Sequence, residues 1–279
     1  MLRIDPKEIS IPQLHGYLLG AVAPRPICFA STVDKEGNVN LSPYSFFNVF
    51  SANPPIMIFS PARRVRGNTT KHTLENILET KEVVINIVSH AMVQQMSLSS
   101  TEYAKGVNEF VKAGFTEVAS DKVSPPRVGE APVQFECKVN DVIALGNEGG
   151  AGNLVIAEVV QLHVDESILD AEGKIDPYKI DTVSRLGGNW YSRAKEGLFE
   201  VEKPLRTLGI GVDALPETIR LSTVLTGNDL GQLANVEVLP VGAEHYIADS
   251  HIQHERAHKL LEEGRVDDAW SELLTKYDN

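Results

Sequence analysis

This 279-residue chain has few cysteines, no excess of positive charge and no long apolar run. The two cysteines, Cys28 and Cys137, lie inside apolar runs, which predicts two buried free thiols in a reducing compartment rather than a disulfide framework. Lys and Arg number 26 against 38 Asp and Glu, for a formal net charge of −12, and this balance argues against a general nucleic-acid binder. No run approaches the ~18 apolar residues of a membrane span. The first residues also lack the apolar core of a signal peptide, so we expect a cytoplasmic protein with no membrane partner.

The first two thirds of the chain contain mostly β-prone segments joined by turn residues. We expect strands at 25–33, 39–50, 56–60, 82–88, 133–145 and 154–164. Gly37 and Asn38 suit a tight hairpin turn between the first two, and a Gly-rich turn at 146–153 joins the last two. Strands do not alternate regularly with long helices, so a doubly wound sheet is disfavoured. The pattern instead predicts a mainly β barrel with peripheral helices.

Helical patterns are few before residue 200 and dominate the end of the chain. We expect a helix beginning at Thr73 as N-cap, with two short ones near 90–97 and 107–113. The last helical segments are predicted at 215–222, 249–264 and 266–276. We therefore divide the chain into a domain at 1–200 and a C-terminal irregular and helical extension at 201–279. Its Leu and Trp faces lead us to expect that this extension packs on the barrel, lengthening a dimer interface or covering a ligand.

One polar stretch, Pro24 to Thr73, is richer in Ser, Thr, Asn, Arg and Lys than a set of core strands requires. A basic loop at 62–70 leads into the predicted helix, whose free N–H groups and dipole favour an anion. Hydroxyl and amide side chains stand on the preceding strands, beside Phe46 and Phe47. These residue types suit a flat, partly apolar ligand that carries a phosphate. A basic surface loop beside an ordinary hairpin remains an equal reading of this stretch alone.

The same stretch resembles the flavin reductase-like, FMN-binding split-barrel family, which includes the flavoredoxins. The resemblance covers roughly residues 10–195 and depends on several motifs in order. These are Pro24-Arg-Pro-Ile27, Ser31-Thr32, Asp34 to Gly37, Asn40-Leu-Ser-Pro-Tyr-Ser-Phe-Phe-Asn48, Pro54-Pro55, Ser60, Lys71-His-Thr-Leu-Glu-Asn-Ile77, Asn86 and Arg185-Leu-Gly-Gly-Asn-Trp-Tyr191. His72 departs from the Lys-Asp-Thr pattern that is common in the family, which weakens a side-chain role for it.

The resemblance implies a homodimeric split β-barrel that holds FMN near the dimer interface. It places Ser31, Thr32, Ser45 and Phe46 along the flavin ring and its edge. From their residue types alone, we expect Phe47 as a further ring contact and Asn48 as a further edge contact. It places Ser60, Arg63, Lys71, His72 and Thr73 around the phosphate. The function that follows is an FMN-dependent oxidoreductase, either an NAD(P)H-dependent flavin reductase or a flavoredoxin-like electron-transfer protein. No side chain is identified as catalytic, because the flavin carries the redox chemistry.

Two other functions stay open from the sequence. The first is a non-enzymatic FMN-binding electron carrier or flavin store. The second is a zinc hydrolase built on His254-Glu255-Arg256-Ala257-His258, which reads as H-E-x-x-H on a helix. Its flanking charges indicate a solvated helix, and little chain remains for a third ligand, so we expect no metal. A serine triad is not indicated, since no G-x-S-x-G occurs.

Overall fold

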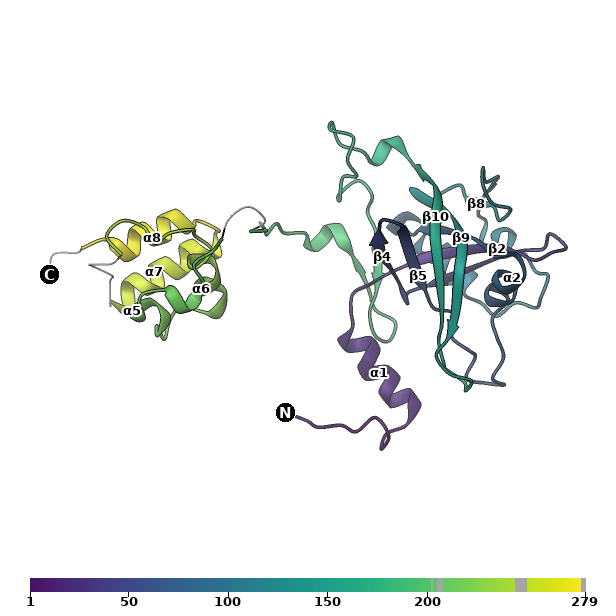
Figure 1. The fold of residues 1–279 in the computed structure, drawn as a ribbon, viewed down its shortest axis with the longest axis horizontal. Coiled ribbons are helices and arrows are strands. Elements are labelled where there is room, and N and C mark those ends of the chain that lie inside the picture. The colour runs from purple at the N-terminus through teal and green to yellow at the C-terminus, as the bar shows by residue number, and fades with distance from the viewer. Residues whose placement is uncertain (202, 205–207, 244–249, 277–279) are drawn as a thin grey trace. The chain divides into compact units, whose positions relative to one another are not determined.

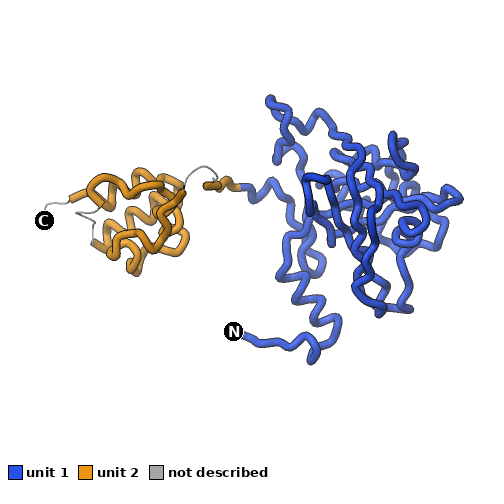
Figure 2. Tube along the Cα trace, viewed as in Figure 1, with its two compact units in different colours: residues 1–198 blue, residues 199–279 orange. Residues whose placement is uncertain are grey.

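The computed structural model describes residues 1–201, 203–204, 208–243 and 250–276 of the chain. They form two compact units, 1–198 and 199–279, shown in blue and orange in Figure 2. The N-terminal unit is built around β-strands, and the C-terminal unit is helical (Figure 1).

Seven antiparallel strands form the main sheet of the N-terminal unit, in the order β3-β2-β6-β9-β10-β5-β4. Their bounds are β2 (Cys28–Val33), β3 (Val39–Tyr44), β4 (Phe47–Ala52), β5 (Pro55–Phe59), β6 (Glu82–Ile87), β9 (Val133–Ala144) and β10 (Asn153–Val164). The outermost strands of this order, β3 and β4, are consecutive in the chain, with only Ser45 and Phe46 between them. The sheet therefore curls until its two edges meet at this bend, as in a barrel.

Two apolar cores lie on the two sides of this sheet. The inner core takes residues from every strand, including Tyr44, Phe59 and Cys137. Helix α2 (His72–Thr80) adds Leu74 and Ile77 to it, so the helix packs on the barrel interior. The outer core lies under the helices α3 (Val93–Ser99) and α4 (Glu109–Ala113). All six residues of β2 are buried because the strand is covered on both faces.

Smaller elements surround the barrel. Helix α1 (Ile11–Ala21) leads to β1 (Arg25–Pro26), which pairs with β11 (Val183–Arg185) and through it with β12 (Tyr191–Arg193) in a separate sheet. A two-stranded ribbon joins β7 (Glu117–Val118) to β8 (Arg127–Val128). The 3₁₀ turns of this unit are η1 (His90–Met92), η2 (Glu166–Ile168) and η3 (Ala194–Gly197).

The C-terminal unit has its own apolar core, which includes Ile219, Leu233, Leu261, Trp270 and Leu273. Its elements are η4 (Val212–Ala214), α5 (Glu217–Arg220), α6 (Gly227–Leu233), α7 (His251–Glu262) and α8 (Val266–Leu274). The predicted helices at 215–222, 249–264 and 266–276 correspond to α5, α7 and α8, each shorter than expected; residue 249 lies outside the described residues. The sequence prediction missed α6, although Thr226 and Asp229 form a capping box at its start.

The structure corrects two local predictions in the N-terminal unit. The single strand expected at 39–50 is two strands, because the chain bends at Ser45 and Phe46 and passes to the other edge of the sheet. The N-cap of α2 is Lys71 and not Thr73. Thr73 lies inside the helix, where its hydroxyl accepts a hydrogen bond from Asn40 Nδ2 at 2.9 Å.

The strands predicted at 82–88, 133–145 and 154–164 are confirmed, and both cysteines are buried and free. Within the described part of the chain, every helix is too short or too polar to cross a membrane.

Candidate functional site: a basic loop and the start of helix α2

The basic loop between β5 and α2 is braced by its own arginines. Arg63 donates from Nε to Asn68 Oδ1 and from Nη2 to the Asn68 carbonyl, each at 2.6 Å. Arg64 donates to the Thr70 carbonyl and pairs with Glu102 at 3.4 Å. These bonds fix the loop's shape and use donors that would otherwise face a ligand. The residues predicted here as charge donors thus act in part as structural braces.

The Gly-rich turn between β9 and β10 is hydrogen-bonded to this loop through the backbone. The Arg63 amide donates to the Ala151 carbonyl at 2.8 Å, and the Gly150 amide donates to the Arg63 carbonyl at 3.0 Å. A Cβ on Gly152 would lie 2.6 Å from Ser60 Oγ, so a side chain there would displace the Ser60 hydroxyl. The turn is a hairpin connection, as the sequence predicted, with an additional role in holding the basic loop.

Ser60 and Asn153 join the loop to the barrel. The Ser60 hydroxyl accepts a hydrogen bond from the Asn153 amide at 3.1 Å, and Asn153 Nδ2 donates to the Pro61 carbonyl at 2.9 Å. Both residues are buried. Sequence reasoning missed Asn153; the only available signal was its place directly after the Gly-rich turn, where an Asn side chain commonly bonds nearby backbone.

Lys71 stands at the entrance of α2, and the Glu102 carboxylate acts on its ammonium from beyond ion-pair distance. Among the described residues it forms no ion pair within 4.0 Å. Its ammonium lies 5.3 Å from the centroid of the Tyr44 ring, a cation–π contact. Burial, and then the nearby Arg64 guanidinium, lower the pKa of Lys71 from its ordinary value. The Lys71 ammonium and the first-turn N–H groups of a nine-residue helix therefore converge where an anion would be stabilised.

Hydrogen bonds under α2 fix its position on the barrel. Besides the bond from Asn40 to Thr73, Asn76 Nδ2 donates to Thr32 Oγ1 at 3.1 Å. Tyr44 is buried beside them; burial raises its pKa well above the ordinary value, and its hydroxyl has no hydrogen-bond partner among the described residues. Thr73 and Thr32 are both fully buried, so their side chains brace the helix. His72 is half-buried at the first position of α2.

The residues predicted to line a ring lie on two different parts of the barrel. Ser31 and Thr32 are consecutive in β2, so their side chains point to opposite faces of the sheet. Ser31 Oγ is buried and has no described partner, whereas Thr32 faces α2. A single flat ligand cannot contact both side chains from one face of this strand.

The bend between β3 and β4 carries the other predicted ring contacts. Phe46 is 42% exposed, and its carbonyl accepts a hydrogen bond from the Ser60 amide at 2.9 Å. Ser45 is half-buried, and Asn48 is exposed, with Oδ1 bound to the Val49 amide. Phe47 points inward and is part of the barrel core. The accessible members of the predicted set near the bend are thus Ser45, Phe46 and Asn48.

The H-E-x-x-H helix of the C-terminal unit is arranged differently from a zinc site. The Nδ1 atom of His254 lies 2.8 Å from Ser222 Oγ, and that of His258 lies 2.9 Å from Asp229 Oδ2. Each ring is therefore hydrogen-bonded to a side chain that also binds the backbone of a neighbouring turn or helix start. Neither ring belongs to a group of three metal-ligating side chains among the described residues.

Comparison with known proteins identifies the family and the fold of the N-terminal unit. The model of the flavin reductase like domain matches residues 20–179. An uncharacterised protein of Aquifex aeolicus is 38% identical over 188 residues, which cover 67% of this chain and 93% of that protein. The crystal structure of nitrilotriacetate monooxygenase component B from Bacillus cereus has 32% identity and a TM-score of 0.67, covering 73% of this chain and 98% of that one. The 2-nitrobenzoate 2-nitroreductase NbaA of Pseudomonas fluorescens has 26% identity and a TM-score of 0.66, covering 75% and 100%.

The curled antiparallel sheet, whose two edge strands meet at one bend, has the split-barrel fold of the solved relatives. The chain belongs to the flavin reductase-like family, so both the family and the split-barrel fold predicted from the sequence are confirmed. The family indicates a flavin-related oxidoreductase with a flavin cofactor. The family match ends at residue 179 and thus lies within the N-terminal unit.

Proposed function

We propose that the N-terminal unit binds FMN, with its phosphate at the basic loop and the start of α2. The observation that carries this proposal is the half-buried Lys71 ammonium, which lies beside Arg64 and the helix N-terminus without a carboxylate within 4.0 Å among the described residues. Such a group is costly unless an anion offsets it. A phosphate dianion is the anion that helix N-termini and lysine favour.

We propose that some of these residues bind the cofactor directly and that others hold the binding residues in position. Lys71 supplies charge, and the first-turn amides at His72 and Thr73 supply donors. Arg63 and Ser60 hold the loop in shape, while Thr32 and Thr73 hold the helix. Around the ring we propose Ser45, Phe46 and Asn48 as direct contacts, since their side chains are accessible. Buried Ser31 and Phe47 would support the ring from behind.

We propose NAD(P)H as the electron donor and a flavin reductase reaction as the activity. FMN supplies two-electron redox chemistry when it is bound. The chain's part is to hold the phosphate, to orient the ring and to present hydroxyl and amide donors at its edge. Phe46 would exclude water from one side of that position. Hydride transfer to a flavin requires no side-chain acid or base.

The experiment combines a spectrum with turnover. Purified protein should be yellow, with flavin absorption bands, and should release FMN on denaturation. Oxidation of NADH or NADPH by the holoprotein with added FMN should then be faster than without protein. A colourless protein that refuses added FMN overturns the cofactor proposal. A yellow protein inactive with both nucleotides overturns the reductase activity and leaves the electron carrier as the function.

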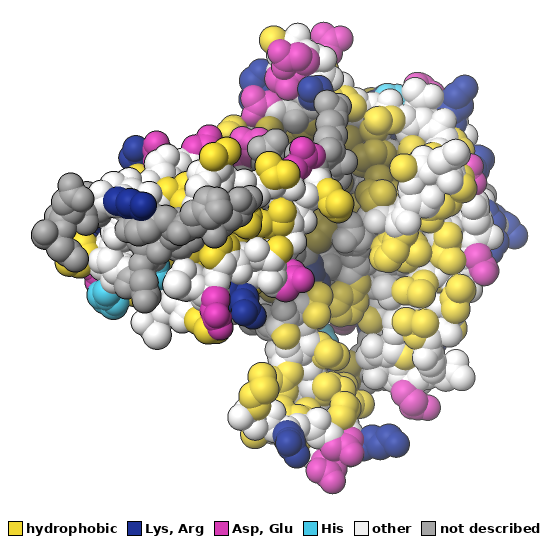
Figure 3. Space-filling view, turned by 60° about the vertical axis from the view of Figure 1, so that its left-hand side comes forward, with side chains coloured by type: hydrophobic (Ala, Val, Ile, Leu, Met, Phe, Trp, Pro, Cys, Tyr) yellow, Lys and Arg dark blue, Asp and Glu magenta, His cyan; other side chains and the backbone are white. Residues whose placement is uncertain are grey.

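We propose that the functional form is a homodimer. Helix α1 is mostly apolar yet buries none of its residues, and Ile11, Tyr17 and Leu18 are each more than half exposed. Figure 3 shows hydrophobic side chains gathered along this helix, which projects downward from the barrel in Figure 1. Exposed apolar patches of this kind mark association surfaces. Light scattering during gel filtration should give twice the 30.6 kDa chain mass, and a monomer would refute this assembly.

A reducing, cytoplasmic location completes the proposal. Cys28 and Cys137 are free and buried in the barrel interior. Free thiols without a disulfide are typical of proteins from reducing compartments. Fractionation of the producing cells tests this location directly.

A further inference from the structure

Two arginines stand opposite each other where β1 pairs with β11, in motifs to which the proposed function gives no role. Arg25 and Arg185 are register partners in this antiparallel pair, so their side chains project from the same face of the ribbon. Among the described residues, neither guanidinium has a carboxylate within 4.0 Å. Like charges directly opposite each other destabilise such a pair. The ribbon therefore carries two neighbouring cations without an ion-pair partner in the described part of the chain.

Arg25 is a buried and fixed cation. It is 6% exposed, and its guanidinium donates to the carbonyls of Leu19 and Val22 at the end of α1 and to the carbonyl of Leu186. Its Nε atom is buried without a described partner. Burial, and then the Arg185 guanidinium, lower the pKa of Arg25 from its ordinary value. Carbonyl groups satisfy most of its donors but carry no full negative charge, so Arg25 adds a positive potential beside Arg185.

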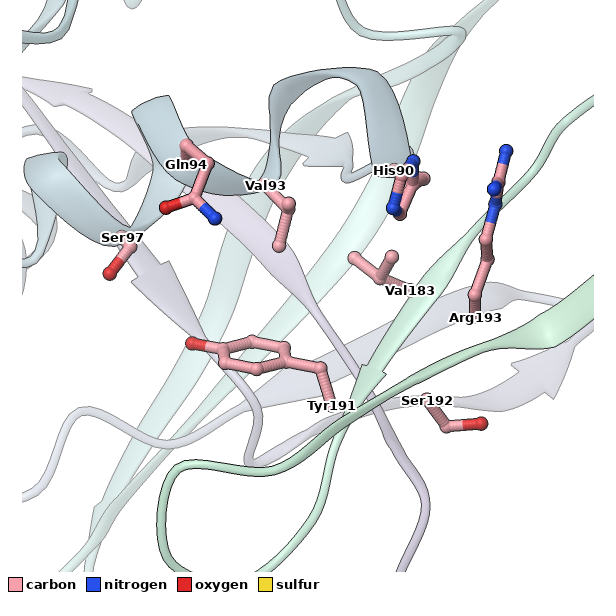
Figure 4. Close-up of a pocket in the computed structure, with 8 residues that line it drawn as sticks. All are labelled: His90, Val93, Gln94, Ser97, Val183, Tyr191, Ser192 and Arg193. Atoms are coloured by element: carbon pink, nitrogen blue, oxygen red, sulfur yellow. The ribbon is translucent and has the colours of Figure 1, made fainter.

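Arg185 is the member of the pair that a ligand can reach. It is half-buried, its guanidinium lies 4.5 Å from the centroid of the Tyr191 ring, and one of its N–H groups donates to the Trp190 carbonyl at 3.4 Å. The Tyr191 ring is itself held at the wall of a cavity of about 260 Å³, beside Val93 and Val183 (Figure 4). Stacking occupies a face of the guanidinium and leaves its other in-plane N–H groups for an anion.

The turn that follows Arg185 adds further donors and an exposed aromatic ring. The amides of Gly187, Gly188 and Asn189 form no hydrogen bond with a described residue. Trp190 is 76% exposed. An exposed indole offers a flat surface on which a purine base can stack. Cationic, amide and aromatic groups thus occur together, which is the chemistry that a nucleotide phosphate requires.

The position of the arginine pair relates it to the proposed flavin site. Strand β1 contacts β4, which directly follows the bend that carries Ser45 and Phe46. Helix α1 begins beside Gly150, whose amide binds the basic loop, and ends beside Gly187. Its eleven residues span about 16 Å. The arginine pair is therefore separate from the basic loop, at a distance that a dinucleotide can extend from a flavin.

We propose that Arg185, supported by Arg25, binds the 2′-phosphate of NADPH, with the adenine stacked on Trp190. This inference rests on the proposed function, in which a nicotinamide cofactor reduces FMN. A phosphate monoester is the dianion that two neighbouring guanidinium groups favour, and a planar guanidinium matches its oxygens. NADH lacks this phosphate. Arg185 is thus the residue that makes NADPH, and not NADH, the preferred electron donor.

The test measures binding of adenosine 2′,5′-bisphosphate and of 5′-AMP to the FMN-saturated full chain by calorimetry. Excess FMN keeps the basic loop occupied, so the loop cannot take the probe. The bisphosphate should bind at least about tenfold more tightly than 5′-AMP. Equal affinities, or no binding of the bisphosphate, overturn the proposal. The measurement needs no turnover, so a reductase that proves inactive does not decide it. A chain that takes up no FMN fails the proposed function alone, and the same titration still measures the arginine site.

Three variants locate the phosphate and the base. Arg185→Gln should weaken binding of the bisphosphate about tenfold and leave 5′-AMP unchanged, because only the former carries the 2′-phosphate. Trp190→Ala should weaken both ligands by a similar factor, about fivefold, because both carry the adenine. Arg220→Gln, on an exposed arginine of α5, is the matched control and should change neither.

If Arg185→Gln fails to fold, Arg185→Lys decides the assignment. This variant keeps the charge and loses the planar fork, so it should reduce the preference for the bisphosphate over 5′-AMP about threefold. A folded Arg185 variant that keeps the full preference of the natural chain refutes the site.

Discussion

The basic residues at the start of α2 in the N-terminal unit and the H-E-x-x-H histidines in the C-terminal unit differ in whether the fold gives them partners. At the start of α2, Lys71 has no acidic partner within 4.0 Å among the described residues. On α7, the H-E-x-x-H histidines are bound to Ser222 and Asp229, side chains that cap neighbouring turns. The first group thus has an unmet electrostatic requirement, and the second is satisfied within its own unit. A spacing motif indicates a ligand site only where the fold leaves its side chains without partners.

The Asp229–His258 pair should give the largest effect of any substitution that tests this contrast. Asp229 is buried, and its Oδ2 atom accepts from the Thr226 amide at 2.6 Å, from Thr226 Oγ1 at 2.7 Å and from His258. Asp229→Ala removes the carboxylate of the capping box and leaves His258 only its contact with the exposed Glu262, so the C-terminal unit should lose about 3 kcal/mol of unfolding free energy. Urea unfolding followed by the fluorescence of Trp270, which is buried in that unit's core, measures this loss.

The matched control is Asp268→Ala in the same unit. Asp268 forms an exposed ion pair with Arg265 and should contribute less than about 1 kcal/mol. FMN binding should be unchanged in both variants. If Asp229→Ala is as stable as Asp268→Ala, the capping role assigned to this pair is wrong.

Lys71→Met should produce the next largest effect. The substitution keeps a flexible side chain over the Tyr44 ring and removes the charge, so FMN affinity should fall by about 10- to 100-fold. Fluorescence titration of the protein with FMN measures this change. Lys112→Met is the control, since the Lys112 ammonium also lies over a tyrosine ring, 5.8 Å from the centroid of Tyr103, at an exposed position of α4. Equal affinities of the two variants would remove Lys71 from the site.

Acid titration should reveal a smaller contribution from Asp181. The hydrogen bond from Arg193, and then that from Lys195, lower the pKa of Asp181 from 3.8 to about 2. A carboxyl group with a lowered pKa stabilises the fold above its unfolded pKa, and this stabilisation is lost as the pH falls from 3.8 through 2. Between pH 5 and pH 2.5, Asp181→Asn should therefore lose less stability than the natural chain. Parallel acid-denaturation slopes would contradict the role of this ion pair.

Truncation after residue 198 should have the smallest effect on the flavin site. The Leu and Trp faces that led us to expect packing on the barrel are buried in the C-terminal unit's own core, as Trp270 and Leu273 show. We now expect residues 1–198 to bind FMN within about twofold of the affinity of the full chain. Titration of both proteins under one condition measures this. A large loss of affinity or of dimerisation would show instead that the C-terminal unit completes the site, as the sequence suggested.

The sequence predicted strands well where burial sets the residue pattern, on one face of the strand or on both. The alternation in β9 and the apolar run of β6 come directly from the need to cover a sheet. The prediction failed at 39–50 and at α6. The bend at Ser45 and Phe46 is only two residues long and contains neither glycine nor proline. The seven-residue helix α6 is too short for a periodic pattern of apolar residues.

The site was predicted less evenly than the fold. The basic composition of the loop and of Lys71 after it predicted an anion site there. The side chains that fix the shape of the loop, Asn68 and Asn153, were not predicted, because asparagine is also common in ordinary turns. The exposure of Phe46 and the burial of Ser31, Thr32 and Thr73 depend on how the sheet curls. No local pattern carries that information.

By itself the sequence determined the class of this protein: an antiparallel barrel followed by helical segments, and a run of motifs similar to the flavin reductase-like family. These features follow from local periodicity and residue order. Only the tertiary structure decided which polar side chains remain free to bind a ligand. Whether Lys71 lacks an ion-pair partner within 4.0 Å among the described residues, or His258 has one, depends on residues that meet in space from distant parts of the chain. That is a property of packing, and packing is cooperative over the whole fold.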